Sequence, residues 1–206
     1  MKPSDIECVV FDVETTGLYP RDGDRIIEIA AVKVRNNEII DTFDQLINPE
    51  RDIPLEAQQV NNISDAMVAD APTAEAVLPQ MLDFIGGASL VGHNVKFDLE
   101  FLCYQLAQTG RRLRSTTPTI DTLKMSRALI PHLNRHRLAN VAQYFGVTIG
   151  ETHRALADVK LTVAVLNRLF ELAYEQGIQT PADIFKQFGV DKPNYKVEDV
   201  NQGSLF

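Results

Sequence analysis

The sequence predicts an α/β protein with a mixed five-stranded sheet flanked by helices. Three strand-like segments open the chain, the later apolar segments alternate between helical and strand-like spacing, and the longest helical pattern comes near the end. Three antiparallel strands followed by alternating helices and short strands form a mixed sheet covered by helices. The 206 residues, 45% of them hydrophobic, suffice for one good core and a small appendage.

The opening strands are set by apolar runs and turn signals. Residues 7–13 form an apolar run that leads into a turn-rich connection. Residues 25–35 and 38–47 are strand-like and flank Asn36-Asn37, which predicts a hairpin. Residues 48–70 are expected to be loop with a short helix.

The rest of the domain alternates helices with short strands, and proline or glycine stands at most of their ends. Short apolar runs predict strands over 88–92 and 119–121. Helical spacing predicts helices over 72–85, 95–109, 122–130, 138–145 and 155–175.

We expect one main domain over 1–176 and a polar extension over 177–206, made of a helix or two and a loose tail. Apolar runs are too short to span a membrane, and the polar N-terminus leaves no room for a signal peptide, so a cytoplasmic protein is expected. Cys8 and Cys103 lack CxxC spacing, which favours reduced core thiols.

The charge is uneven along the chain. The net charge of −8 argues against non-specific coating of nucleic acid. Residues 110–140, however, hold seven arginines and lysines and one acid, a net charge of +6. Such a segment suits an enzyme that holds a short piece of nucleic acid, although a solvated helical face explains it equally well.

Two acids stand on the first strand. Side chains alternate along a strand, so Asp12 and Glu14 share one face while Phe11 and Val13 face the opposite layer. Buried unpaired acids are costly, and a divalent metal is the simplest compensation. Taken alone, the pair fits equally well a strand end that reaches solvent.

Three further residues carry potential chemistry. Asp98 and Asp158 each lie near a helix start, where an acid commonly just stabilises the helix dipole. His153 stands five residues before Asp158, so both serve one site only if His153 lies on the loop ahead of the helix. A lone loop histidine is often merely solvated.

Three blocks together resemble the DEDD exonuclease superfamily, in the subgroup with a catalytic histidine, and most of all the proofreading subunits of bacterial DNA polymerase III. The first block is Asp12-Val13-Glu14-Thr15-Thr16-Gly17. The second is His93-Asn94-Val95-Lys96-Phe97-Asp98-Leu99-Glu100-Phe101-Leu102. The third is His153-Arg154-Ala155-Leu156-Ala157-Asp158. Three blocks in order are far more specific than any one of them.

The resemblance implies an RNase H-like fold and removal of nucleotides one at a time from DNA 3′ ends, in proofreading or repair. It implies that two divalent ions, Mg²⁺ or Mn²⁺, lie about 4 Å apart between four carboxylates. Their ligands would be Asp12, which contacts both ions, Glu14, Asp98 and Asp158. His153 would accept the proton of the attacking water, with activity rising from about pH 6 to 8.

The resemblance also implies a substrate path to the metals. Backbone groups of Thr15 and Thr16 would hold the 3′ hydroxyl, and Leu18 would wedge against the terminal base. The residues expected to bind substrate are Thr15, Thr16, Gly17, Leu18, His93, Asn94 and Phe97. Core packing is an equal alternative for Phe97.

The last five residues, 202–206, resemble the clamp-binding peptide of bacterial replication proteins, with Gln202, Leu205 and Phe206 as contacts. A tail that folds back on the domain is the alternative. Expected partners are a frayed or single-stranded DNA 3′ end, a polymerase subunit and a sliding clamp, with no membrane. Two other functions stay open, namely an RNA-trimming exonuclease and a scaffold that recruits polymerase and clamp.

Overall fold

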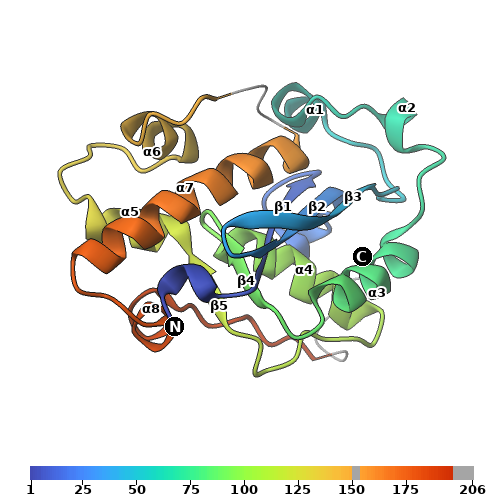
Figure 1. Cartoon of the computed structure of the whole chain (residues 1–206). Coiled ribbons are helices and arrows are strands. Elements are labelled where there is room, and N and C mark those ends of the chain that lie inside the picture. Colours follow the sequence, from blue (N-terminus) through green and yellow to red (C-terminus); the bar gives the residue numbers. More distant parts are fainter. Residues whose placement is uncertain (150–153, 197–206) are drawn as a thin grey trace.

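A five-stranded mixed sheet forms the centre of the molecule, as predicted (Figure 1). The computed structural model describes residues 1–149 and 154–196. Its strands are β1 Cys8–Thr15, β2 Ile26–Arg35, β3 Glu38–Leu46, β4 Ser89–Gly92 and β5 Thr119–Asp121, arranged in the order β3-β2-β1-β4-β5. The pairs β1–β2 and β2–β3 are antiparallel, whereas β4 and β5 run parallel to β1.

The hairpin between β2 and β3 turns at Asn36-Asn37, as predicted. Both asparagines are left-handed, with φ of 52° and 65°, which is the geometry of a tight two-residue hairpin turn. The register of β1 against β2 shifts once, because Glu14 pairs with Glu28 but Thr15 pairs with Ile26. Such a bulge bends the strand and re-aims side chains beside it.

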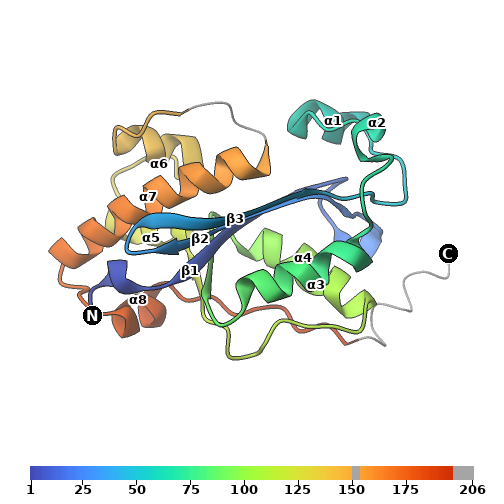
Figure 2. The same cartoon turned by 45° about the vertical axis from the view of Figure 1, so that its right-hand side comes forward.

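Helices cover both faces of the sheet and one of its ends (Figures 1 and 2). The helices α3 and α4 lie on one face, α5 to α8 lie on the other, and the short α1 and α2 stand beyond the end of the sheet. Their bounds are α1 Leu55–Asn61, α2 Asp65–Val68, α3 Ala74–Ile85, α4 Lys96–Gln108, α5 Thr122–Leu129, α6 Leu138–Tyr144, α7 Ala155–Glu175 and α8 Pro181–Phe188, with 3₁₀ turns η1 Pro3–Asp5 and η2 Pro20–Asp22.

The predicted helix over 72–85 starts two residues late. Thr73 is the N-cap of α3 in extended conformation, and the carbonyl of Pro72 accepts a hydrogen bond from the Asn48 amide instead of starting the helix. The longest predicted helix, over 155–175, is confirmed with the same bounds. The apolar stripe of the helix over 155–175 extends over its whole length, so it indicates both ends. A proline near the start of a helix, such as Pro72, does not determine which residue begins the helix.

Alternate residues of β1 enter two separate cores. Cys8 and Val10 join the core beneath α5–α8, while Val9, Phe11 and Val13 join the core beneath α3 and α4. Asp12 and Glu14 therefore lie on the α7 face of the sheet.

The first part of the predicted C-terminal extension packs on the domain. Ile184 and Phe188 of α8 belong to the core beneath α7, and Gly189 then forms a bridge with Ile120 of β5. Tyr195 contacts Tyr104 of α4 edge-on, with the ring centroids 5.3 Å apart. Within the described part of the chain, no helix has both the length and the apolar character needed to cross a membrane.

Candidate active site

Three carboxylates meet at the carboxyl end of β1. Asp12 and Glu14 reach this point from the strand, and Asp158 reaches it from the first turn of α7. One oxygen from each of the three lies within 4.8 Å of the others, and all three side chains are half-buried. Hard oxygen ligands at this spacing are suited to a divalent cation.

Asp98 approaches the same strand end from the opposite layer. Its side chain is buried, and its Oδ1 accepts a hydrogen bond of 3.1 Å from the Val13 amide. The β1–β4 ladder ends at the pair Val10–Val91, so the Val13 amide lies beyond the paired residues, and Asp98 satisfies it. Among the described residues, Asp98 does not belong to the group of acids whose oxygens lie within 4.8 Å of one another. A carboxylate has two oxygens, so this bond is compatible with metal binding through Oδ2.

The acids raise one another's pKa values. Burial, followed by the charges of Asp98 and Glu14, holds the pKa of Asp12 well above its ordinary value. Burial and the charge of Glu28 raise the pKa of Glu14 to about 7, and burial raises that of Asp98 to about 8. A bound cation would relieve both the desolvation and the repulsion, so this residue set fits a divalent metal.

A fourth acid on the same face, Glu28 of β2, has its own cation. It faces Glu14 directly across the β1–β2 pair and is 1% exposed. Arg154 donates from Nε to both Glu28 oxygens, at 3.0 and 3.2 Å, and the Ala155 amide donates to Oε2 at 2.9 Å. Glu28 of β2 thus caps the N-terminus of α7 and holds in place the first turn of that helix, which carries Asp158.

The sequence prediction missed Glu28 and Arg154. A glutamate in the otherwise apolar run 26–32 was the available signal, since a buried strand rarely carries an unpaired acid. Its partner could not be identified from the sequence, because Arg154 is 126 residues away.

A tight turn follows the acids. Thr15 and Thr16 are buried, whereas Leu18 is 65% exposed, so its apolar side chain is available to a ligand. The Thr15 hydroxyl donates to the Gly17 carbonyl at 2.6 Å, and the Thr16 amide donates to the Arg25 carbonyl at 2.9 Å. These bonds fix the backbone that the sequence predicts as the 3′-end site.

The substrate-binding residues predicted from the second block differ in their exposure and contacts. Both ring nitrogens of His93 have partners, with Nδ1 2.9 Å from the Thr122 hydroxyl and Nε2 2.8 Å from the His136 carbonyl. Asn94 is exposed in a left-handed turn, with φ of 65°. Phe97 is half-buried and its ring lies 5.1 Å from that of Phe101. His93 is therefore engaged within the protein, while Asn94 offers an exposed surface.

The basic segment 110–140 is divided between the two ends of the sheet. All seven of its cationic side chains are exposed. Residues 111–114 precede β5, so they lie at the end of the parallel strands opposite the acids. The loop with Arg135 and Arg137 lies beside His93, through the His136 carbonyl, at the acidic end. Of these two parts of the segment, the loop with Arg135 and Arg137 is the one at the end of the sheet that carries the acids.

Four predicted residues lie outside the described residues. They are His153, Gln202, Leu205 and Phe206, and their roles remain predictions.

Comparisons with known proteins concern the family and the fold of the chain. The family model RNase_T, described as Exonuclease, matches residues 9–166. DNA polymerase III PolC-type of Caldanaerobacter subterraneus subsp. tengcongensis is 40% identical over 178 residues, which are 86% of this chain and 12% of that protein. The chain thus spans 12% of the length of this relative.

Two solved structures share the fold. Exonuclease X in complex with 5′ overhanging duplex DNA matches with a TM-score of 0.68 and 26% identity, covering 87% of this chain and 98% of that one. E. coli Exonuclease I in complex with a dT13 oligonucleotide matches with a TM-score of 0.73 and 18% identity, covering 84% and 42%. The second likeness supports the fold alone. With the family model matched over most of its length, this chain belongs to the RNase_T exonuclease family.

Proposed function

We propose that this chain is a metal-dependent exonuclease that removes nucleotides one at a time from DNA 3′ ends, in proofreading or repair. The observation that carries the proposal is the meeting of Asp12, Glu14 and Asp158 within 4.8 Å, beside an exposed Leu18. The DNA in the structure of Exonuclease X and the polymerase relative support DNA as the substrate.

In this proposal the four acids Asp12, Glu14, Asp98 and Asp158 hold two divalent ions, Mg²⁺ or Mn²⁺. When bound, such ions supply activation of a water molecule and stabilisation of the departing 3′ oxygen. Backbone groups of Thr15 and Thr16 hold the terminal 3′ hydroxyl, and Leu18 lies against its base. Because the acids are partly buried, the phosphodiester reacts where water competes little with the protein's groups.

His153 is proposed as the general base, which takes the proton from the attacking water. It precedes Arg154, which Glu28 holds at the start of α7. A neutral imidazole is required, so at saturating Mg²⁺ the single-turnover rate should rise from about pH 6 to 8. His153→Ala should lower that rate by roughly 10²- to 10⁴-fold and flatten the profile. An unchanged rate would remove this role.

The polarity and substrate are tested with single-stranded oligonucleotides labelled at either end. A 5′-labelled strand should give a ladder that shortens from the 3′ end, in Mg²⁺ or Mn²⁺ and not with chelator. Matched DNA, mispaired DNA and RNA of one sequence compare the substrates, and mispaired DNA should be degraded fastest. Faster loss of RNA would indicate an RNA-trimming enzyme, and absence of any hydrolysis would indicate a scaffold.

The terminal peptide is proposed to bind a sliding clamp. Deleting Leu205 and Phe206 should abolish clamp binding, measured by surface plasmon resonance, and leave hydrolysis of short oligonucleotides unchanged. Clamp binding that survives the deletion would contradict the proposal, as would equal loss of binding and hydrolysis. A polymerase subunit is the other proposed partner, because the relative at 40% identity is a DNA polymerase III.

A further inference from the structure

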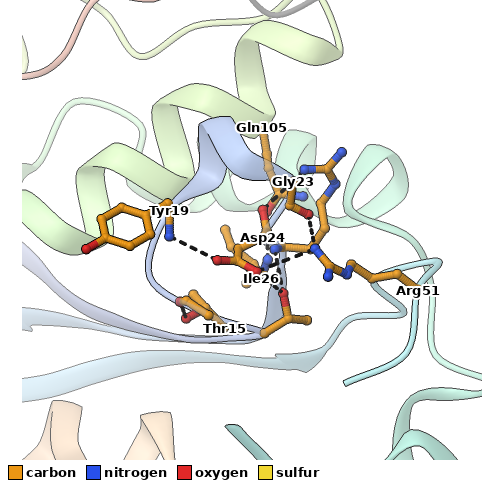
Figure 3. Close-up of polar contacts among 10 residues, drawn as sticks. Thr15, Tyr19, Gly23, Asp24, Ile26, Arg51 and Gln105 are labelled. Atoms are coloured by element: carbon orange, nitrogen blue, oxygen red, sulfur yellow. Dashed lines mark hydrogen bonds and ion pairs between the residues drawn. The ribbon is translucent and has the colours of Figure 1, made fainter. Parts of the chain in front are cut away.

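Asp24 is the centre of the hydrogen bonds that shape the turn after β1 (Figure 3). Its Oδ1 accepts from the Thr16 hydroxyl at 3.2 Å, and its Oδ2 accepts from the Tyr19 amide at 3.0 Å. The Thr16 hydroxyl in turn accepts from the Arg25 amide at 3.0 Å. One carboxylate therefore joins the start and the end of the turn.

Gly17 makes room for this carboxylate. A Cβ atom on Gly17 would lie 2.3 to 2.6 Å from the carboxylate atoms of Asp24, closer than any real contact. A side chain at position 17 would therefore have to displace the Asp24 carboxylate from the position it holds here. The Asp24 side chain and the backbone of the turn form one fitted unit.

Arg51 connects this unit to the segment ahead of α1. Its Nη1 donates to the Gly23 carbonyl at 2.5 Å and lies 3.4 Å from Asp24 Oδ1. In Figure 3, Asp24 lies between Tyr19 on one side and Arg51 on the other. The Asp24 side chain is 17% exposed and that of Arg51 39%, so water screens the pair only in part.

A second bond ties the same segment to the turn. Asn61, the last residue of α1, is buried and donates from Nδ2 to the Thr15 carbonyl at 3.4 Å. The loop and helix over 48–61 thus hold the turn at Thr15 and at Asp24. Among the described residues, Asp24 is outside the acidic group of Asp12, Glu14 and Asp158.

We infer that Asp24, with Arg51, is a positioning residue that sets the shape of the turn over Thr15–Tyr19 and so selects DNA ends with a free 3′ hydroxyl. The inference rests on the proposed function, which places the 3′ hydroxyl at the backbone of Thr15 and Thr16. Backbone groups bind a small polar ligand only when they are held at the correct spacing. Asp24 acts through the turn and does not touch the reacting atoms.

The test measures binding separately from hydrolysis. In Ca²⁺, which is expected to prevent turnover, fluorescence anisotropy gives the affinity for two dT oligonucleotides, one ending in a 3′ hydroxyl and one in a 3′ phosphate. The wild type should prefer the hydroxyl end. Asp24→Ala should weaken binding of the hydroxyl end by roughly tenfold, the equivalent of one good hydrogen bond, and reduce the preference. Asp24→Asn keeps one acceptor oxygen, so its affinity for the hydroxyl end should lie between those of the wild type and Asp24→Ala.

Kinetics and a matched control complete the test. In Mg²⁺, Asp24→Ala should raise KM about tenfold with kcat within about threefold. Asp22→Asn, an exposed acid in the same loop, should change neither quantity. Arg51→Ala should reproduce part of the effect, and the double variant should be no worse than Asp24→Ala.

Two results would overturn the inference. One is a lower kcat with unchanged KM, since that places Asp24 in the chemistry. The other is an equal loss of affinity for both 3′ ends, since that reflects general destabilisation, which thermal denaturation would reveal. A wild type that binds hydroxyl ends selectively but hydrolyses nothing would sink the proposed function while leaving this inference intact.

Discussion

Two glutamates that face each other across β1 and β2 are treated in opposite ways by the fold. Glu28 is fully buried and is neutralised by Arg154 and by the N-terminus of α7. Glu14 is half-buried, and its neighbours are mostly acids, which together with burial raise its pKa to about 7. The protein supplies the cation for Glu28, whereas the proposed function assigns a bound metal ion to Glu14.

The difference separates a structural acid from a proposed metal ligand. A buried acid with its own arginine costs little and holds elements together, as Glu28 holds the start of α7. An acid grouped with other acids is costly until a metal binds, so such a group persists where metal chemistry requires it. Both types occur on one face of one sheet, on two neighbouring strands.

The largest expected effect concerns the acidic side of the comparison. Asp12→Asn should lower kcat by roughly a thousandfold or more, since metal-assisted hydrolysis depends on several kcal/mol of charge stabilisation. The metal-free variant should unfold at no lower temperature than the wild type, because an acid repelled by its neighbours has been removed. Asp44→Asn, an exposed acid of β3 on the same face, is the control and should keep its activity. Loss of activity together with loss of fold would contradict the ligand role.

The second prediction concerns the neutralised side. Arg154→Ala leaves the Glu28 charge buried and unpaired, and should lower the free energy of unfolding by about 3–5 kcal/mol. Glu28→Ala should cost less, because the Arg154 side chain is 44% exposed and can be solvated. Arg168→Ala, which removes an exposed pair with Glu171 on the same helix, should cost at most about 1 kcal/mol. Urea denaturation measures all three, and equal effects of the first two would refute the asymmetry.

The third prediction is a pH dependence that the acidic side of the comparison should produce. In the metal-free protein, burial raises the pKa of Glu14 to about 7 and that of Asp98 to about 8, above unfolded values near 4. The folded state therefore binds more protons than the unfolded state in this window, so stability falls as pH rises from about 5 to 8.

Mg²⁺ should reverse that trend. Its binding displaces these protons, so the apparent Mg²⁺ affinity should rise with pH over the same range. At a hundredfold excess over Kd it would add about 2.7 kcal/mol to the free energy of unfolding. Thermal denaturation at pH 5, 6.5 and 8, with chelator and with Mg²⁺, measures both effects. A metal-free protein that becomes more stable toward pH 8 would contradict the assignment.

Most of the fold was predictable from local patterns. The buried runs of β1 and β2, the Asn36-Asn37 turn and the apolar stripe of α7 each determine their own element, because strand and helix periodicities are local properties. The start of α3 was not predictable from local patterns, because it depends on a hydrogen bond between the Pro72 carbonyl and the distant Asn48 amide. The packing of Tyr195 on Tyr104 is equally non-local.

The acids of the site were visible in the sequence, but their partners were not. Strand alternation alone places Asp12 and Glu14 on one face, and the three sequence blocks indicate the family. Only the folded chain brings Asp158 to them, turns Asp98 onto the Val13 amide and pairs Glu28 with Arg154. The physical reason is that which face a side chain takes is set by local backbone geometry. Whether a cation of the protein reaches that side chain depends on contacts between residues far apart in the chain.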